Sequence, residues 1–284
     1  PMTIVSSTEN GLNEYIGDNK PENPACAVAW TDEKTGEVTY RNGRNELIDA
    51  IRAIGSKPDS LQKIITLIEA GAEVNYKVPE FCGKYFRVQY EAGSTPLHVI
   101  LRTQSMSAAE VVSALLKKGA DVNARTSLGT NAFFEIKTWG HPSHEVDAKI
   151  MHLFLDYGFD ADEKGRFSGD YIASYIGGYE DPLNTEIHKS EINGIIYAVQ
   201  LLRNPELLLP LVKRMIEKAD INFQMSNGVT ALDFLVGATG DSTKTKVKFF
   251  IDNGANLQLR DRLGRRACEI TPKYNAEVKA LVCQ

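Results

Sequence analysis

The sequence predicts an all-α fold of stacked helix-turn-helix units, preceded by a small N-terminal arm that is irregular or forms a β-hairpin. A phrase typical of a helix end recurs, most clearly as LIEAGAEVN from Leu67 and LLKKGADVN from Leu115. A phrase typical of a helix start follows it, as in GSTPLH and GVTALD. The glycines that open this second phrase are spaced by 36 residues in three places: Gly93 to Gly129, Gly129 to Gly165, and Gly228 to Gly264.

The first 42 residues do not follow this repeat. Two apolar runs, ACAVAW and EVTY, flank the turn residues TDEKTG, which is the pattern of a β-hairpin. We therefore expect residues 1–42 to form an arm that packs on the first repeat, with residues 1–20 partly disordered.

The clearest unit lies in the segment that begins at Gly93. Thr95 can cap a helix, and Pro96 then falls at the first helical position, where its missing N–H has no cost. The next helix has an apolar stripe at helical spacing, formed by Val111, Val112, Leu115 and Leu116. Gly119 ends that helix, because glycine adopts the left-handed conformation without a steric penalty.

The same pattern divides the rest of the chain into units. We expect them at about 43–92, 93–128, 129–164, 165–190, 191–227 and 228–263, with a truncated terminal unit at 264–284. The 165–190 unit is short, and Gly177 to Glu191 within and after it is expected to be a long acidic and polar loop. One helix pair cannot bury its apolar stripe alone, but stacked pairs bury it continuously.

These units resemble the ankyrin repeat. The resemblance is carried by GSTPLH…VVSALLKKGADVNAR and by GVTALD…VKFFIDNGANLQLRD, and it covers roughly residues 43–284. The usual period is about 33 residues, so the longer spacing here implies extra residues in the turns between helices, as in RTQSMSA. The resemblance implies a concave face, lined by first helices and loop tips, that binds other proteins.

The charge, the apolar runs and the cysteines of the chain indicate which partners and which cell compartment to expect. The net charge of −5 does not favour a nucleic-acid partner, and no apolar run approaches the ~20 residues of a membrane span. The first 25 residues lack the apolar core of a secretory signal. The four cysteines are scattered, which favours reduced thiols in the cytoplasm: Cys26, Cys82, Cys268 and Cys283. We expect a cytoplasmic monomer, in the host-cell cytoplasm if the chain is a secreted effector.

The sequence indicates no catalytic residue, cofactor or metal. The motifs GxGxxG, GxxxxGK[ST], HExxH and GxSxG are all missing. His141, His144 and His152 have no cysteine nearby and are interpreted as structural or surface histidines. If the N-terminal region were a remnant of a catalytic module, Cys26 would be its candidate nucleophile. It is a weak candidate, because 42 residues are too few for an independent catalytic domain.

Two loop tips are candidate partner sites. The segment from Tyr76 to Ala92 is an insertion whose aromatic and cationic residues are of the types enriched at interfaces: Tyr76, Phe81, Lys84, Tyr85, Phe86, Arg87 and Tyr90. They could instead pack back on the repeats, and both interpretations stay open. The second tip, RDRLGRR, could bind acidic side chains or phosphates through four arginines: Arg260, Arg262, Arg265 and Arg266. The alternative is a solvated tip, partly neutralised by Asp261 and Glu269.

Asn75 and Asn123 occupy the ends of GAEVN and GADVN. The resemblance implies that such asparagines can be hydroxylated by an asparaginyl hydroxylase. The alternative is a side chain that stabilises the local turn through backbone hydrogen bonds.

The sequence therefore predicts a protein-recognition module of adaptor or effector type, with no chemistry of its own. One alternative is an inhibitor that occludes a partner's site with the 76–92 loop. Another is the non-catalytic or targeting part of an enzyme.

Overall fold

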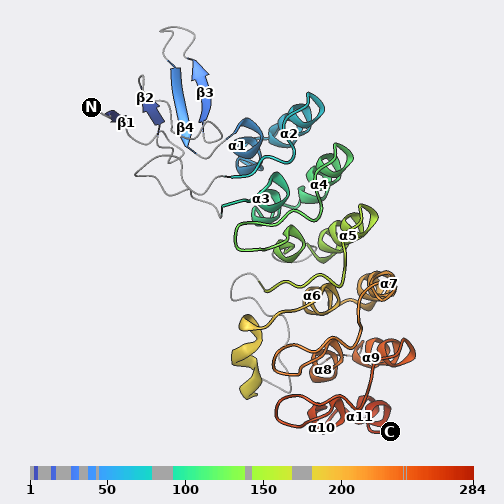
Figure 1. Cartoon of the computed structure of the whole chain (residues 1–284). Helices are drawn as coiled ribbons and strands as arrows, with labels where there is room; N and C mark the ends of the chain where they lie inside the picture. The colour runs from blue at the N-terminus through green and yellow to red at the C-terminus, as the bar shows by residue number, and fades with distance from the viewer. Residues whose placement is uncertain are drawn as a thin grey trace. The chain divides into compact units, whose positions relative to one another are not determined.

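The computed structural model describes residues 3–5, 14–16, 27–31, 38–42, 45–78, 92–137, 143–167, 181–238, 240 and 242–284. The chain forms two compact units, Pro1–Ala132 and Phe133–Gln284, called unit 1 and unit 2 below (Figure 1). No helix in the described ranges combines the length and the apolar character needed to cross a bilayer. The predicted boundary between an arm and the repeats at residue 42 stays a prediction.

Unit 1 begins with a four-stranded antiparallel sheet of strand order β1-β2-β4-β3. The strands are β1 (Thr3–Val5), β2 (Glu14–Ile16), β3 (Ala27–Thr31) and β4 (Val38–Asn42). The β3–β4 pair is the hairpin that ACAVAW and EVTY predict, with Ala27 opposite Asn42. Strands β1 and β2 were not predicted, because three residues are too few to show an alternating pattern.

Two helix pairs follow in unit 1: α1 (Glu46–Arg52) with α2 (Ser60–Glu69), and α3 (Pro96–Arg102) with α4 (Ala108–Lys117). α1 packs against α3, and α2 packs against α4, so the pairs stack (Figure 1). The apolar stripes of all four helices are buried between them, as Ile48, Ile64, Ile100 and Val112 illustrate. This is the burial that the repeat pattern predicts.

The ends of the second pair are built as the sequence indicates. Thr95 is the N-cap of α3, and Pro96 is its first residue. The Nδ1 atom of His98 accepts a hydrogen bond of 3.1 Å from the Thr95 N–H, so the first turn is closed by a side chain. At the end of α4, Gly119 has a φ of +86°, the left-handed conformation expected there.

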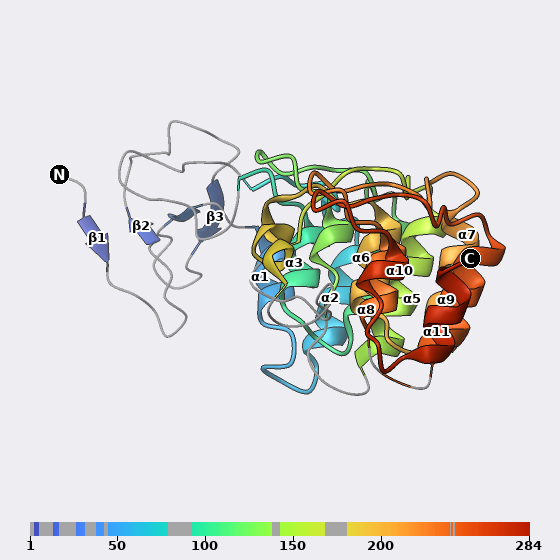
Figure 2. The same cartoon turned by 90° about the horizontal axis from the view of Figure 1, so that it is seen from below.

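Unit 2 has two rows of helices. One row holds α6 (Gly194–Leu201), α8 (Ala231–Gly237) and α10 (Ala267–Ile270), and the other holds α5 (Ser143–Asp156), α7 (Pro205–Met215), α9 (Thr243–Asp252) and α11 (Ala276–Val282). Successive helices within each row pack together, and α6–α7, α8–α9 and α10–α11 form the pairs. Figures 1 and 2 show the two rows from two sides.

The start of unit 2 departs from the regular helix pair. The predicted first helix of the 129–164 unit is only a 3₁₀ turn, η2 (Ala132–Glu135). Phe133 and Phe134 of this turn are fully buried, and Phe133 stacks on Phe159 with ring centroids 4.1 Å apart. The Tyr197 hydroxyl donates to the carbonyl of Phe134 at 2.9 Å, so helix α6 fixes this turn.

The segment after Gly165 also differs from the expectation of a long loop. Residues Pro182–Lys189 form a 3₁₀ helix, η3. Asp181 is its N-cap and accepts a 3.0 Å hydrogen bond from the Leu183 N–H, while Pro182 takes the first helical position. The dipeptide Asp181-Pro182 is a sequence signal for a helix start. The acidic and polar composition of the segment predicted a loop instead.

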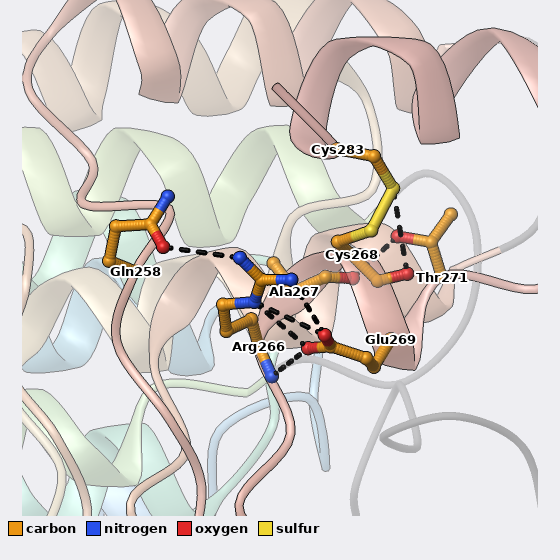
Figure 3. The surroundings of a disulfide bond; sticks show 7 residues. All are labelled: Gln258, Arg266, Ala267, Cys268, Glu269, Thr271 and Cys283. Carbon is orange, nitrogen blue, oxygen red and sulfur yellow. Dashed lines mark hydrogen bonds and ion pairs between the residues drawn. A yellow bond between two sulfur atoms is a disulfide. The ribbon is translucent and has the colours of Figure 1, made fainter.

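The terminal helix pair is cross-linked. Cys268 of α10 and Cys283, directly after α11, form a disulfide with their Cα atoms 4.9 Å apart (Figure 3). The prediction of reduced thiols is therefore wrong for these two cysteines. Their separation of 15 residues gave no pairing signal, because it is the antiparallel packing of two short helices that brings them together. Cys26 and Cys82 lie outside the described residues.

Candidate protein-binding surface

Three tight turns that precede first helices share one backbone structure, and we call them fingers. The first finger is residues 125–130, the second is 224–229 and the third is 260–265. In each finger, the backbone N–H of the second residue donates to the backbone carbonyl of the sixth residue. In the third finger, for example, the Asp261 N–H donates to the Arg265 carbonyl at 2.9 Å. The fifth residue is a glycine with φ of about +80°, namely Gly129, Gly228 and Gly264. The fingers are thus rigid turns that depend on a left-handed glycine.

The first side chain of each finger closes the turn. Arg125 donates to the Gly129 carbonyl at 3.3 Å, Gln224 to the Gly228 carbonyl at 2.9 Å, and Arg260 to the carbonyl of Gly264. Arg260, a predicted partner-binding residue, therefore has a structural role in shaping the third finger.

The second and third fingers are joined edge to edge. The Arg262 N–H donates to the Asn227 carbonyl at 2.8 Å. A Cβ atom on Gly228 would lie 2.8 Å from the Cα of Asp261, so the approach requires glycine at position 228. In unit 1, Gly93 makes the matching approach to Ser127 of the first finger.

Arg265 of the third finger is held by two carboxylates. Its Nη1 and Nη2 atoms contact the two carboxylate oxygens of Asp181 at 2.7 and 3.1 Å, and its Nε contacts Asp261 at 2.8 Å. The Asp181 and Asp261 side chains are 4% and 0% exposed. The hydrogen bond to Asp181, followed by that to Asp261, raises the pKa of the Arg265 guanidinium.

The other two predicted arginines also have partners in the chain. Arg262 forms an ion pair with Glu186 of η3. Arg266 contacts Glu269 at 2.8 Å and the Gln258 side chain at 3.2 Å (Figure 3). The hydrogen bond from Arg266 lowers the pKa of the Glu269 carboxyl to about 2. Partner binding by these four arginines stays a prediction. In this structure Asp261 pairs with Arg265 and Glu269 pairs with Arg266, as in the alternative of a partly neutralised tip.

Helix η3 covers part of unit 2. In Figures 1 and 2 it lies beside α6 and α8, on the side away from α7 and α9, which we call the inner face of unit 2. Its Leu183 and Ile187 side chains are fully buried. Ser190, directly after η3, shares a 2.7 Å hydrogen bond with Ser226 of the second finger.

The base of the segment that carries η3 is closed by a backbone pair. The N–H of Gly165 donates to the Ile192 carbonyl at 2.9 Å, and the N–H of Ile192 donates to the Gly165 carbonyl at 2.8 Å. A Cβ atom on Gly165 would lie 2.2 Å from the Phe134 ring, so this closure also requires glycine.

The first finger presents a different tip. Leu128, its fourth residue, is 82% exposed, whereas Leu263 at the same place in the third finger is 49% exposed. An exposed leucine on a rigid turn can contact a partner with little loss of conformational entropy on binding.

The predicted aromatic insertion is described only at its ends. Tyr76 is half-buried, and burial raises the pKa of its hydroxyl. Val78 donates to the Ser94 carbonyl at 2.9 Å, so the two ends of the insertion meet. The other predicted contact residues lie outside the described ranges: Phe81, Lys84, Tyr85, Phe86, Arg87 and Tyr90. Partner binding by these residues stays a prediction.

The two candidate hydroxylation sites have backbone partners. The Asn75 side chain donates to the Gly119 carbonyl at 2.9 Å and accepts from the Asp121 N–H at 2.7 Å, so it links two successive repeats. Asn222 makes the same link to Gly254 in unit 2. Asn123 is exposed, and its N–H donates to the Asp121 carboxylate at 2.9 Å. Their hydroxylation stays a prediction.

The histidines do not meet at one place in the described structure. His152 contacts the Arg214 guanidinium at 2.9 Å, and burial together with Arg214 lowers the pKa of its imidazole. His144 lies on the same helix, α5, while His141 and Cys26 fall outside the described residues. Within the described ranges, no group of three His, Cys, Asp or Glu side chains is placed to hold a metal ion.

In α8, Asp233 occupies the third helical position, where α3 has His98. Its carboxylate accepts hydrogen bonds from the Thr230 N–H at 2.8 Å and the Thr230 hydroxyl at 3.0 Å. Burial raises the pKa of this carboxyl to about 6, with Asp261 as a further cause.

Comparisons with known proteins agree with this architecture. Residues 92–127 match the ankyrin repeat family. Among solved structures, the ankyrin repeat protein EF0377 is 20% identical with a TM-score of 0.53, over 85% of this chain and 99% of that one. The ankyrin repeat domain of Bcl-3, a member of the IkappaB protein family, is 18% identical with a TM-score of 0.50, over 85% of this chain and 83% of that one.

A third similar chain belongs to the complex of the predatory endopeptidase Bd0816 from Bdellovibrio bacteriovorus with the immunity protein Bd3460. It is 17% identical with a TM-score of 0.54, over 85% of this chain and 98% of that one. No curated protein sequence matches this chain. At these identities, the structural likeness establishes the fold.

Proposed function

This chain carries an ankyrin repeat and has the ankyrin-repeat fold, and we propose that it is a protein-recognition module whose fingers bind a partner protein. The observation that carries the proposal is Leu128, which is 82% exposed at the tip of a turn whose backbone is fixed by hydrogen bonds. Because the tip is already ordered, little conformational entropy is lost when a partner covers it. The module needs no chemistry of its own.

The role in the cell is either that of an adaptor or that of an effector delivered into a host cell. The two differ in where the chain acts. A cytoplasmic location was expected from the scattered cysteines, but the Cys268–Cys283 disulfide favours an oxidising compartment. Fractionation of tagged chain, with thiol labelling at once on lysis, decides between these locations.

The test of the proposed function uses the chain as bait with matched variants. We expect Leu128→Ser, and separately the combined alanine change of Phe81, Tyr85, Phe86 and Arg87, to lose the captured partner. Lys218→Ala, at an exposed position after α7, should capture it as the unaltered chain does. Equal capture by all four chains would contradict the proposal, and so would the absence of any captured protein. Thermal unfolding of each variant controls for misfolding.

A second candidate is an inhibitor that occludes a partner's site with the 76–92 loop. It is favoured by one of the similar structures, in which a chain of this fold belongs to a complex of an endopeptidase with an immunity protein. If this candidate holds, the captured partner is an enzyme and added chain lowers its activity. The loop variant of the same test should leave that activity unchanged.

A further inference from the structure

Helix η3 has the chemical features of a bound peptide rather than of a connecting loop. It turns two carboxylates, Asp181 and Glu186, toward the third finger, where they pair with Arg265 and Arg262. Its apolar side chains Leu183 and Ile187 are both fully buried against the rest of unit 2. The segment is thus a short amphipathic helix with acidic and apolar contact residues.

The surface that receives η3 is organised by contacts that do not involve η3. Asp261 accepts hydrogen bonds from the Arg265 N–H at 2.9 Å and from its Nε at 2.8 Å. These bonds leave Nη1 and Nη2 directed at the Asp181 carboxylate as a fork. The Arg262 N–H is tied to the second finger through the Asn227 carbonyl. A guanidinium held in this way is pre-oriented for bidentate recognition of a carboxylate.

The base of the segment is closed by contacts that do not involve η3. The Gly165–Ile192 backbone pair closes the segment below η3, and α6 begins directly afterwards at Gly194. The Arg262–Glu186 pair is more than half exposed on the arginine side, so it contributes little. The hold on η3 therefore depends mainly on Asp181, Leu183 and Ile187, together with the Ser190–Ser226 hydrogen bond at its end.

We propose that the inner face of unit 2, beside the second and third fingers, is a receptor site for a short acidic amphipathic helix, which η3 fills in the free protein. A partner binds there by replacing η3. The partner must present the pattern of η3. Counted from a first carboxylate, as at Asp181, it needs an apolar residue at +2, a second carboxylate at +5 and a second apolar residue at +6. The inference rests on the proposed protein-recognition function and gives one of its sites a partner chemistry.

The test measures binding of a fluorescent peptide with the sequence of residues 181–193 to the full chain. Asp181→Asn combined with Glu186→Gln should weaken the internal contact while keeping an N-cap side chain at position 181. We expect this variant to bind the peptide about tenfold more tightly than the unaltered chain does, since a charge-assisted hydrogen bond of the internal competitor is lost. Adding Arg262→Ala and Arg265→Ala to the variant should abolish binding.

The control peptide carries the same two carboxylate replacements and should bind about tenfold more weakly than the first. Equal binding of both peptides, or unchanged binding after the arginines are removed, would overturn the acidic specificity. No binding of the peptide to the weakened variant would overturn the receptor site itself.

Amide hydrogen exchange on the unaltered chain covers the case in which a variant does not fold. We expect the η3 amides to exchange by local opening, faster than those of α8. If η3 exchanges only together with α8, the segment is a permanent part of the fold and the inference is wrong. Loss of capture by Leu128→Ser would still support the proposed function, so the two failures are distinguishable.

Discussion

The first and third fingers have the same backbone but different surroundings. Both begin with an arginine that donates to the glycine carbonyl four residues later, and both have leucine at the fourth position. They differ at the second and sixth positions, which are Thr126 and Thr130 in one and Asp261 and Arg265 in the other. Glycine and the first side chain thus set the turn, whereas the second and sixth residues decide what it can hold.

The difference extends to the tip. Leu128 is almost fully exposed in the first finger, while the third finger has η3 as a neighbour and its Leu263 is half covered. The Asp261–Arg265 pair binds the acidic N-cap of η3, and two threonines offer no such charge. A repeat can therefore keep its backbone while its tip changes from an open contact point to an occupied site.

The largest effect should come from the cross-link that follows the third finger. Replacing Cys268 and Cys283 by serine should lower the stability of the terminal helix pair by about 3 kcal/mol, because the unfolded state regains loop entropy. Hydrogen exchange should show faster exchange in α10 and α11, with α3 and α4 beside the first finger unchanged. Faster exchange in both places would contradict a local role for the cross-link.

Gly228→Ala should cost about 2–3 kcal/mol, because it adds a clash with Asp261 to the cost of a positive φ. Gly264→Ala is the matched control, since it has the same φ and open space around it, and should cost about 1 kcal/mol. Urea unfolding measures both. Equal costs would mean that the second and third fingers are not in close contact.

The pH dependence of the free energy of unfolding should show the effect of Asp233, which α8 has where α3 has His98. Since the pKa of Asp233 is about 6 in the folded chain, above its unfolded value, the folded state binds the extra proton between about pH 4 and 6. Its contribution to stability is therefore largest near pH 4 and is lost as the pH rises to about 6, by about 2 kcal/mol. Urea unfolding of the chain and of Asp233→Asn at pH 4 to 7 should show this difference, and parallel pH profiles would refute it.

The smallest effects should distinguish the two arginines that hold η3. Arg265→Ala leaves Asp181 and Asp261 without their cation and should cost about 1–2 kcal/mol, discounted because Arg265 is partly exposed. Arg262→Ala removes an exposed pair and should cost at most about 0.5 kcal/mol. Thermal unfolding of both variants measures this, and a reversed order would show that Arg262 is the main contact.

Much of this fold could be predicted because glycines and apolar stripes repeat along the chain. The caps at Thr95 and Gly119 and the β3–β4 hairpin follow from local sequence alone. The η3 contact could not be predicted in the same way, because Asp181 lies 84 residues before Arg265 and only the folded repeats bring them together. The arginines at 260–266 suggested a partner, and the partners found for them are carboxylates, a carbonyl and an amide of the same chain.

The central claim is that an exposed finger tip is the surface on which a partner protein is bound. A photo-crosslinking amino acid at position 128 tests it most directly, with the same amino acid at position 218, an exposed position of unit 2 that belongs to none of the three fingers, as the control. The account predicts one discrete crosslinked protein from position 128 and none from position 218. Identical crosslinks from both positions, or none from position 128, would contradict it.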